Sequence, residues 1–279
     1  MPEFASPDRN VILSPRMETT SMPITFTDSR AALVVAHPGH ELRIYQWLRL
    51  ARPLCFVLTD GSGNAGKSRL HATTNILEPV GARRGGVYGR LTDPAIYAAM
   101  LEGDVDLFVG LAKEIARELA EEEIDYVVGD AIEGYNPAHD ICRFLINAVV
   151  ENVNRQRQQP ILNFEIFLSG ETNNDLKKGP GDIWLELDEE SSTKKLTAAR
   201  AYVELAADID QTLTREGMQA IQIEHLCLAS SKWDGASETP YYEIHGERQV
   251  AAGHYDQVVR YRAHIRPIAD ALMRWASNS

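Results

Sequence analysis

Short apolar runs alternate with amphipathic segments over roughly the first 150 residues of the chain. Residues 31–36, 53–59 and 125–130 are apolar runs of strand length. Residues 102–122 and 140–153 instead carry apolar side chains at helical spacing. This alternation predicts an α/β fold of three layers, with a Rossmann-like, mostly parallel sheet flanked by helices.

The second half of the chain predicts additions to this α/β unit. Further strands are expected at residues 160–168, 183–187 and 221–228, with one helix over about 192–213. The last strands predict a smaller, β-containing C-terminal addition, and the polar residues 170–181 predict a long loop beside the substrate. Residues 1–29 show no sustained periodicity, so we expect a flexible N-terminal arm before a single domain over residues 30–279.

Composition and charge exclude several classes of protein. Of the 279 residues 44% are hydrophobic, which suffices for a core, and no run reaches membrane-spanning length. The formal net charge of −12 argues against nucleic acid or an anionic membrane as a partner. Three widely spaced cysteines predict buried thiols in a reducing compartment, so a cytoplasmic location is expected. Homo-oligomerisation stays open.

The first predicted strand ends in candidate metal ligands. His37 and His40 lie where the apolar run 31–36 gives way to an amphipathic helix, and Pro38 and Gly39 mark the turn between them. Ligands bind at this carboxyl end of the strands in open α/β sheets. Two neutral imidazoles on a tight turn suit zinc. The same spacing also fits a helix start with one exposed histidine and one that bonds to the backbone.

A second segment strengthens the metal interpretation through a resemblance. Residues 36–41, AHPGHE, resemble the AHPDDE signature of the PIG-L/LmbE-like family of zinc-dependent N-acetylglucosaminyl de-N-acetylases. The family's second signature, HPDH, is similar to Asn136-Pro137-Ala138-His139, which follows the strand at 125–130. The resemblance covers residues 31 to about 270. It implies one zinc ion on His37, His40 and His139.

The chain departs from the family pattern at the catalytic positions. The resemblance implies that His40 replaces a carboxylate ligand and that Gly39 replaces the general base. Asn136 stands where the family has a histidine that stabilises the transition state, and Ala138 replaces the acid that orients it. An acid restored at position 39 is therefore expected to raise activity. The candidates for a replacement base are Glu41, Asp60, Glu133 and Asp140.

The resemblance and the ligand set together predict a zinc-dependent hydrolase. Three neutral histidines leave the full charge on zinc, which brings the pKa of its bound water to about 7 in such sites. That water would attack an acyl amide of a sugar-like small molecule, and another divalent transition metal could replace zinc. The expected substrate-binding residues are Arg69, Lys67, Tyr135, Tyr242 and Glu243. The alternative is a catalytically silent or repurposed member that binds a sugar-like ligand.

A phosphate-binding motif leaves a second alternative open. Residues 61–68, GSGNAGKS, match the GxxxxGK[ST] pattern of the Walker A loop and follow a predicted strand. Asp130 ends another strand, as a Walker B acid would. Against this, Thr59-Asp60-Gly61 also fits the loop that the family resemblance implies after its second strand. A nucleotide-binding protein is thus the third hypothesis.

Overall fold

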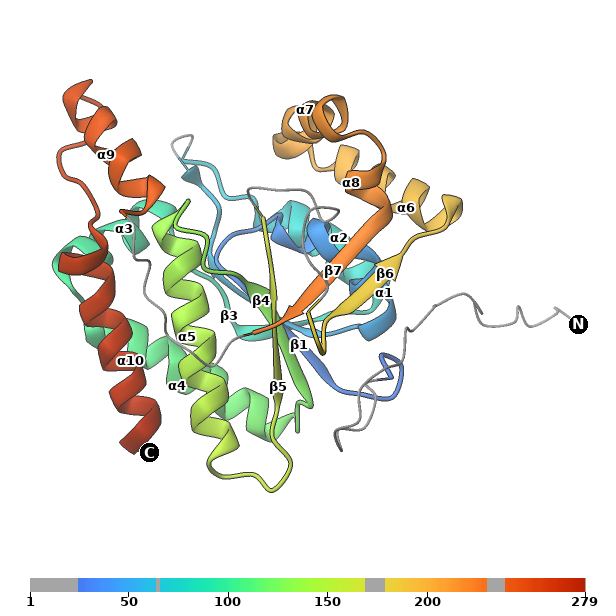
Figure 1. The fold of residues 1–279 in the computed structure, drawn as a ribbon, viewed down its shortest axis with the longest axis horizontal. Helices are drawn as coiled ribbons and strands as arrows, with labels where there is room; N and C mark the ends of the chain where they lie inside the picture. Colours follow the sequence, from blue (N-terminus) through green and yellow to red (C-terminus); the bar gives the residue numbers. More distant parts are fainter. Residues whose placement is uncertain (1–24, 64–65, 169–178, 230–238, 279) are drawn as a thin grey trace, which may run out of the picture.

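A seven-stranded sheet forms the middle layer of the molecule (Figure 1). The computed structural model describes residues 25–63, 66–168, 179–229 and 239–278. The strand order is β3-β2-β1-β4-β5-β7-β6. The strands are β1 (Ala31–Val35), β2 (Leu54–Thr59), β3 (Arg83–Leu91), β4 (Tyr126–Asp130), β5 (Leu162–Ile166), β6 (Ile183–Glu186) and β7 (Ile223–Leu228).

The strand directions confirm the predicted fold class. Strands β1 to β5 are all parallel, and Leu33 in the middle of β1 lies opposite Cys55 of β2 and Val128 of β4. Strand β7 is antiparallel to both β5 and β6, so the predicted C-terminal strands extend the same sheet. The hydrophobic pattern did not predict β3, because this edge strand is half exposed and contains Gly85 and Gly86.

Helices cover both faces of the sheet and close two hydrophobic clusters (Figure 1). One cluster lies under α4, α5 and α10, and the other lies under α1, α2 and α6. The helices are α1 (Tyr45–Ala51), α2 (Leu70–Val80), α3 (Asp93–Glu102), α4 (Val105–Glu121), α5 (Pro137–Asn154), α6 (Glu189–Ala201), α7 (Ala206–Glu216), α8 (Gln219–Gln222), α9 (Tyr241–Ala251) and α10 (Arg266–Asn278). The shorter 3-10 and π-helical turns are η1 (His40–Ile44), η3 (Val203–Leu205) and η4 (Tyr261–Ile265).

The helix expected over residues 192–213 is interrupted, and in this respect the prediction was wrong. Tyr202 has φ −82° and ψ 86°, which ends α6 and starts the turn η3. Its side chain is buried, and its hydroxyl donates to the carbonyl oxygen of Arg69 at 3.3 Å. A tertiary contact therefore overrides the helical pattern at this residue, and α7 turns away over the sheet edge.

Some predictions fall partly outside the described residues. The expected N-terminal arm and the loop expected at 170–181 lie mostly in residues 1–24 and 169–178. Within the expected arm, Phe26 is buried and its ring centroid lies 6.4 Å from that of Tyr126 in β4. None of the described helices is long and apolar enough to span a bilayer.

Candidate metal centre

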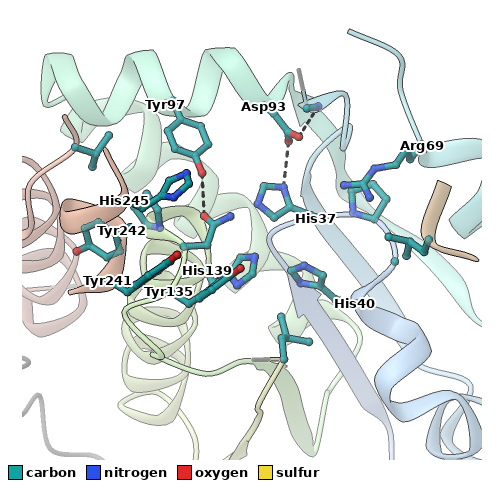
Figure 2. A pocket seen from close by; sticks show the side chains of 18 of the residues that line it. His37, His40, Arg69, Asp93, Tyr97, Tyr135, His139, Tyr241, Tyr242 and His245 are labelled. Atoms are coloured by element: carbon teal, nitrogen blue, oxygen red, sulfur yellow. Dashed lines mark hydrogen bonds and ion pairs between the residues drawn. The ribbon is translucent and has the colours of Figure 1, made fainter. Parts of the chain in front are cut away.

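Three histidines meet at the carboxyl ends of two adjacent strands. The chain leaves β1 and β4 toward opposite sides of the sheet, which opens a crevice between them. His37 and His40 follow β1, and His139 lies in the first turn of α5, which follows β4. Their ring centroids are 4.6 to 5.5 Å apart, and all three pairs meet edge to face (Figure 2). The topology thus gathers residues that are a hundred positions apart in the sequence.

The hydrogen bonds of His37 fix which ring nitrogen is free. The Thr59 hydroxyl donates to the carbonyl of Ala36, so its oxygen accepts the Nδ1 proton of His37 at 2.8 Å. Asp93 Oδ1 lies 3.1 Å from the same nitrogen. Nε2 is buried and has no partner among the described residues. Burial lowers the pKa of His37, although the hydrogen bond that the ring donates to Asp93 opposes this shift. The lowered pKa favours the neutral ring, which is the form that binds metals.

His40, which bonds to the end of β4, and His139, which follows β4, complete the cluster. Asp130 ends β4, and its two carboxylate oxygens accept the Nδ1 proton of His40 at 2.9 Å and the backbone amide of Ala36 at 2.8 Å. Nδ1 of His139 is buried without a partner in the described part of the chain. Burial, followed by the neighbouring His40, lowers the pKa of His139 well below its ordinary value.

This arrangement fits a transition-metal ion. Within the described residues, one buried nitrogen on each of His37 and His139 has no partner, and the rings of His37 and His40 are oriented by carboxylates, which is how metal-binding histidines are held in proteins. Among the described residues, Asp182, His225 and Cys227 form the one group whose ligand atoms all lie within 4.8 Å of one another. The three histidines are spaced more widely and would draw together around an ion.

Two carboxylates of this centre were not predicted as site residues. Asp93 follows β3, which the hydrophobic pattern missed, although Thr92-Asp93-Pro94 carries the residues of a helix start. Asp130 was noted only as a possible Walker B acid. Burial alone would raise the pKa of Asp93, but the hydrogen bond and charge of His37 and the amide of Gly63 hold it well below its ordinary value.

Replacing Asp93 by alanine is expected to weaken metal binding by roughly 10–100-fold, because His37 loses the carboxylate that fixes its ring and tautomer. Zinc affinity measured by competition with a chelator checks this. Asp106→Ala, which removes an exposed carboxylate from the first turn of α4, is the matched control. Equal affinities in the two variants would show that Asp93 does not act through His37.

The three histidines open into a cavity of about 1060 Å³. Tyr97 of α3 and the aromatic residues of α9, among them Tyr241 and His245, line one side of it (Figure 2). Tyr135 stacks on Tyr241 with 5.3 Å between centroids and 4° between planes, although both side chains are about half exposed. The lining also includes the apolar side chains of Leu42, Leu168, Leu205, Ile209 and Ile221.

Four of the ten residues expected in catalysis or substrate binding line this cavity. They are Arg69, Tyr135, Asn136 and Tyr242. The carboxamide oxygen of Asn136 accepts the Tyr97 hydroxyl at 3.1 Å and the Ala138 amide at 2.8 Å. The oxygen is thus already bonded within the protein, and the NH₂ group of Asn136 is the end that remains for a substrate.

The four expected bases lie outside the cavity lining and bond to the protein itself. Glu41 is buried, and its carboxylate accepts the Gly39 amide at 2.8 Å and the Thr73 hydroxyl at 2.7 Å. Asp60 accepts the amide of Ser62 at 2.9 Å. These two carboxylates brace the loops that follow β1 and β2.

The other two acids brace the loop after β4. Asp140 accepts the amides of Glu133 and Gly134, and burial raises its pKa to about 7. Glu133 accepts the amide of Leu168 at 3.1 Å. A carboxyl group with a pKa near 7 suits acid–base catalysis, but Asp140 does not border the cavity.

Two of the expected substrate-binding residues also lie elsewhere. Lys67 is exposed outside the cavity lining. Glu243 accepts the amide of Tyr261 at 2.8 Å and pairs with Arg260 at 3.3 Å. Glu243 therefore joins α9 to the turn η4.

The structure changes what we expect of an acid at position 39. Gly39 has φ +107°, and a Cβ atom there would lie 2.5 Å from Cδ1 of Leu205. Gly39→Asp is therefore expected to lower the free energy of unfolding by about 1–3 kcal/mol without raising activity. Urea unfolding and amide hydrolysis measure both effects.

A second glycine with positive φ serves as the comparison. Gly253 has φ +75° and open space around its Cβ position. Gly253→Asp has no side-chain contact to meet, so the extra loss in Gly39→Asp reports the contact with Leu205 together with the less favourable φ of +107°. A gain of activity in Gly39→Asp would contradict this account of the site.

Three amides of the Walker-like loop donate to groups within the protein. The amides of Gly61, Ser62 and Gly63 donate to Thr59 Oγ1, Asp60 Oδ1 and Asp93 Oδ2, respectively. Residues 64–65 lie outside the described residues, and α2 begins at Leu70. Because a phosphate loop points its amides at the ligand, these contacts do not favour the nucleotide-binding hypothesis.

The comparisons with known proteins give structural neighbours only. No family model and no curated protein matches the chain. The chain is similar to the A40926 pseudoaglycone deacetylase Dbv21, with 18% identity, 72% of this chain and 99% of that chain covered, and a TM-score of 0.47. It is also similar to the zinc-inhibited form of the teicoplanin deacetylase Orf2, with 14% identity, coverages of 73% and 100%, and a TM-score of 0.47. Both of these neighbours are deacetylases.

Proposed function

We propose that the chain is a metal-dependent hydrolase that cleaves an acyl amide bond on a sugar-like small molecule. The observation that carries this proposal is the cluster of His37, His40 and His139 beside the cavity, where buried nitrogens of His37 and His139 have no partner in the part of the chain that the structure describes. Zinc suits such an all-nitrogen ligand set, and other divalent transition metals are the next candidates. When bound, the ion supplies a Lewis acid that polarises an acyl carbonyl and acidifies water.

The chain's own groups orient the substrate in this proposal. The NH₂ group of Asn136 donates to the acyl carbonyl oxygen as that oxygen gains negative charge, and Tyr97 and the Ala138 amide hold the carboxamide in place. Arg69 lines the cavity and offers a positive charge to a polar substituent. Its Nε donates to the carbonyl oxygen of Gly61 at 2.6 Å, which fixes the guanidinium.

The proposed mechanism lacks a positioned general base for proton transfer. Asp93 lines the cavity, but its bond to His37 and its lowered pKa make it an orienting group and a poor base. A missing general base slows a hydrolysis by roughly 10²–10⁴-fold. The proposed enzyme therefore depends on the metal more than an enzyme with a positioned base does.

The walls of the cavity support an amphipathic, sugar-like substrate. The exposed faces of Tyr135 and Tyr241 offer flat apolar surface with hydroxyl groups at the edges, which suits the ring of a sugar. The apolar side chains of the cavity lining suit an acyl group or another hydrophobic substituent.

Release of free amine from a panel of N-acyl amino sugars tests the proposal. The full chain is stripped of metal with a chelator and then restored with zinc, and both forms are assayed in parallel. Amine release that returns with zinc is the expected result. Binding of a sugar without amine release would favour the silent, ligand-binding alternative. If no sugar of the panel is bound or hydrolysed, the proposal is overturned.

A further inference from the structure

A second group of metal-ligating side chains lies on the antiparallel extension of the sheet, away from the three histidines. Asp182 directly precedes β6, and His225 and Cys227 lie on β7, the strand that pairs with it. Residues two apart on a strand point to the same face, so His225 and Cys227 share one face of β7. The opposite face of β7 carries Glu224 and Leu226, and Leu226 belongs to the hydrophobic core.

The donor atoms of this group lie close together. Asp182 Oδ2 lies 2.9 Å from His225 Nε2, and Cys227 Sγ lies 3.3 Å from the same nitrogen and 3.4 Å from Nδ1. All three ligand atoms lie within 4.8 Å of one another. Ordinary zinc–ligand bond lengths in a tetrahedral site separate nitrogen and sulfur donors by about 3.6 Å. The separations therefore suit one ion, and the Cys227 side chain would turn toward Nε2 to bind it.

The surrounding protein holds these donors in place. The two carboxylate oxygens of Asp182 accept the amides of Leu228 at 2.9 Å and Gly179 at 2.8 Å. Trp184 stacks on the imidazole of His225, with 3.8 Å between centroids and 22° between planes. His225 is buried, and Asp182 and Cys227 are partly buried. Bonds to the ligands and a packed ring of this kind set ligand orientation in metal sites.

We propose that Asp182, His225 and Cys227 form a second metal site, which binds one zinc ion through oxygen, nitrogen and sulfur. On binding, the Cys227 thiol releases its proton to solvent and the thiolate takes a coordination position. A thiolate among the ligands selects zinc or a soft transition metal over magnesium or calcium. The ion would join the start of β6 to the end of β7 and would stabilise this edge of the sheet.

The two proposed sites differ in chemistry, so one spectrum separates them. Cobalt substituted for zinc gives a thiolate-to-metal charge-transfer band in the near ultraviolet only where a cysteine is bound. The first site holds histidines alone, so the band reports the second site. We expect wild-type full chain to bind two equivalents of zinc and to show this band with cobalt.

Variants of the full chain complete the test. Cys227→Ser and His225→Gln are each expected to abolish the band and to lower the zinc content by one equivalent. Cys55→Ser, which replaces a buried cysteine on β2, is the matched control and should keep the band. His139→Ala should also keep the band while losing the zinc of the first site, so failure of the hydrolase proposal is distinguishable. A band that is absent in folded wild type, or unchanged in Cys227→Ser, would overturn the second site.

Discussion

Replacing His139 by alanine is expected to remove one equivalent of metal and to abolish hydrolysis. Nδ1 of His139 is buried and has no partner among the described residues. The substitution therefore breaks no hydrogen bond of Nδ1 within that part of the chain. Loss of a ligand should weaken zinc binding by more than the roughly 10–100-fold that an outer partner contributes. Elemental analysis and amine release measure the two effects on the same preparation.

The stability of this variant should change little. His139 lies at the cavity edge in the first turn of α5, where Asn136 and Pro137 still define the helix start. His71→Ala, which removes an exposed histidine from α2, is the matched control and should keep metal and activity. Full metal content in His139→Ala, with the Asp182–Cys227 site accounted for by the cobalt band, would mean that the three-histidine assignment is wrong.

Replacing Lys195 by methionine is expected to lower the free energy of unfolding by about 3–5 kcal/mol. The ammonium group of Lys195 is 3.0 Å from the carboxylate of Glu224, and both side chains are almost fully buried. Lys195 also donates to the carbonyl oxygen of Arg43 at 2.8 Å. Methionine keeps most of the volume but leaves the charge of Glu224 buried without its cation. Urea unfolding at fixed metal loading measures the loss.

The adjacent lysine gives a matched control. Lys194 is exposed and pairs with Glu190 on the same helix, so Lys194→Met should change the free energy of unfolding by less than about 1 kcal/mol. Glu224 has a further role, because its two oxygens accept the amides of Gln46 and Trp47 at the start of α1, each at 2.8 Å. The double variant Lys195→Met, Glu224→Leu should therefore regain only part of the stability that Lys195→Met alone loses. Equal losses in Lys194→Met and Lys195→Met would refute the burial argument.

The resemblance in the sequence located the three-histidine cluster but not the groups that orient it. His37, His40 and His139 were found because each lies next to a strand end with a recognisable signature. Asp93 was not predicted because it follows the edge strand β3. The glycines and exposed side chains of β3 do not give the hydrophobic pattern of a strand. Its proximity to His37 comes from sheet order, which a local pattern does not contain.

The candidate bases illustrate the same limit. Glu41, Asp60, Glu133 and Asp140 were expected near the site because they follow strand ends, and they do lie at that edge of the sheet. Whether a carboxylate faces a cavity or a backbone amide depends on the rotamer and on the local turn. The carboxylates of these four residues accept hydrogen bonds from backbone amides of the neighbouring loops.

The sequence by itself determined the α/β class, the strands at the centre of the sheet and the histidines that meet at its carboxyl edge. These features depend on hydrophobic periodicity and on residues adjacent to strand ends, which are local properties of a chain. Only the tertiary structure decided that Asp93 and Asp130 orient His37 and His40, that Leu205 fills the space beside Gly39, and that Asp182 meets His225 and Cys227. Each of these contacts joins segments that are distant in sequence, so the order of the strands and the packing of the side chains create it.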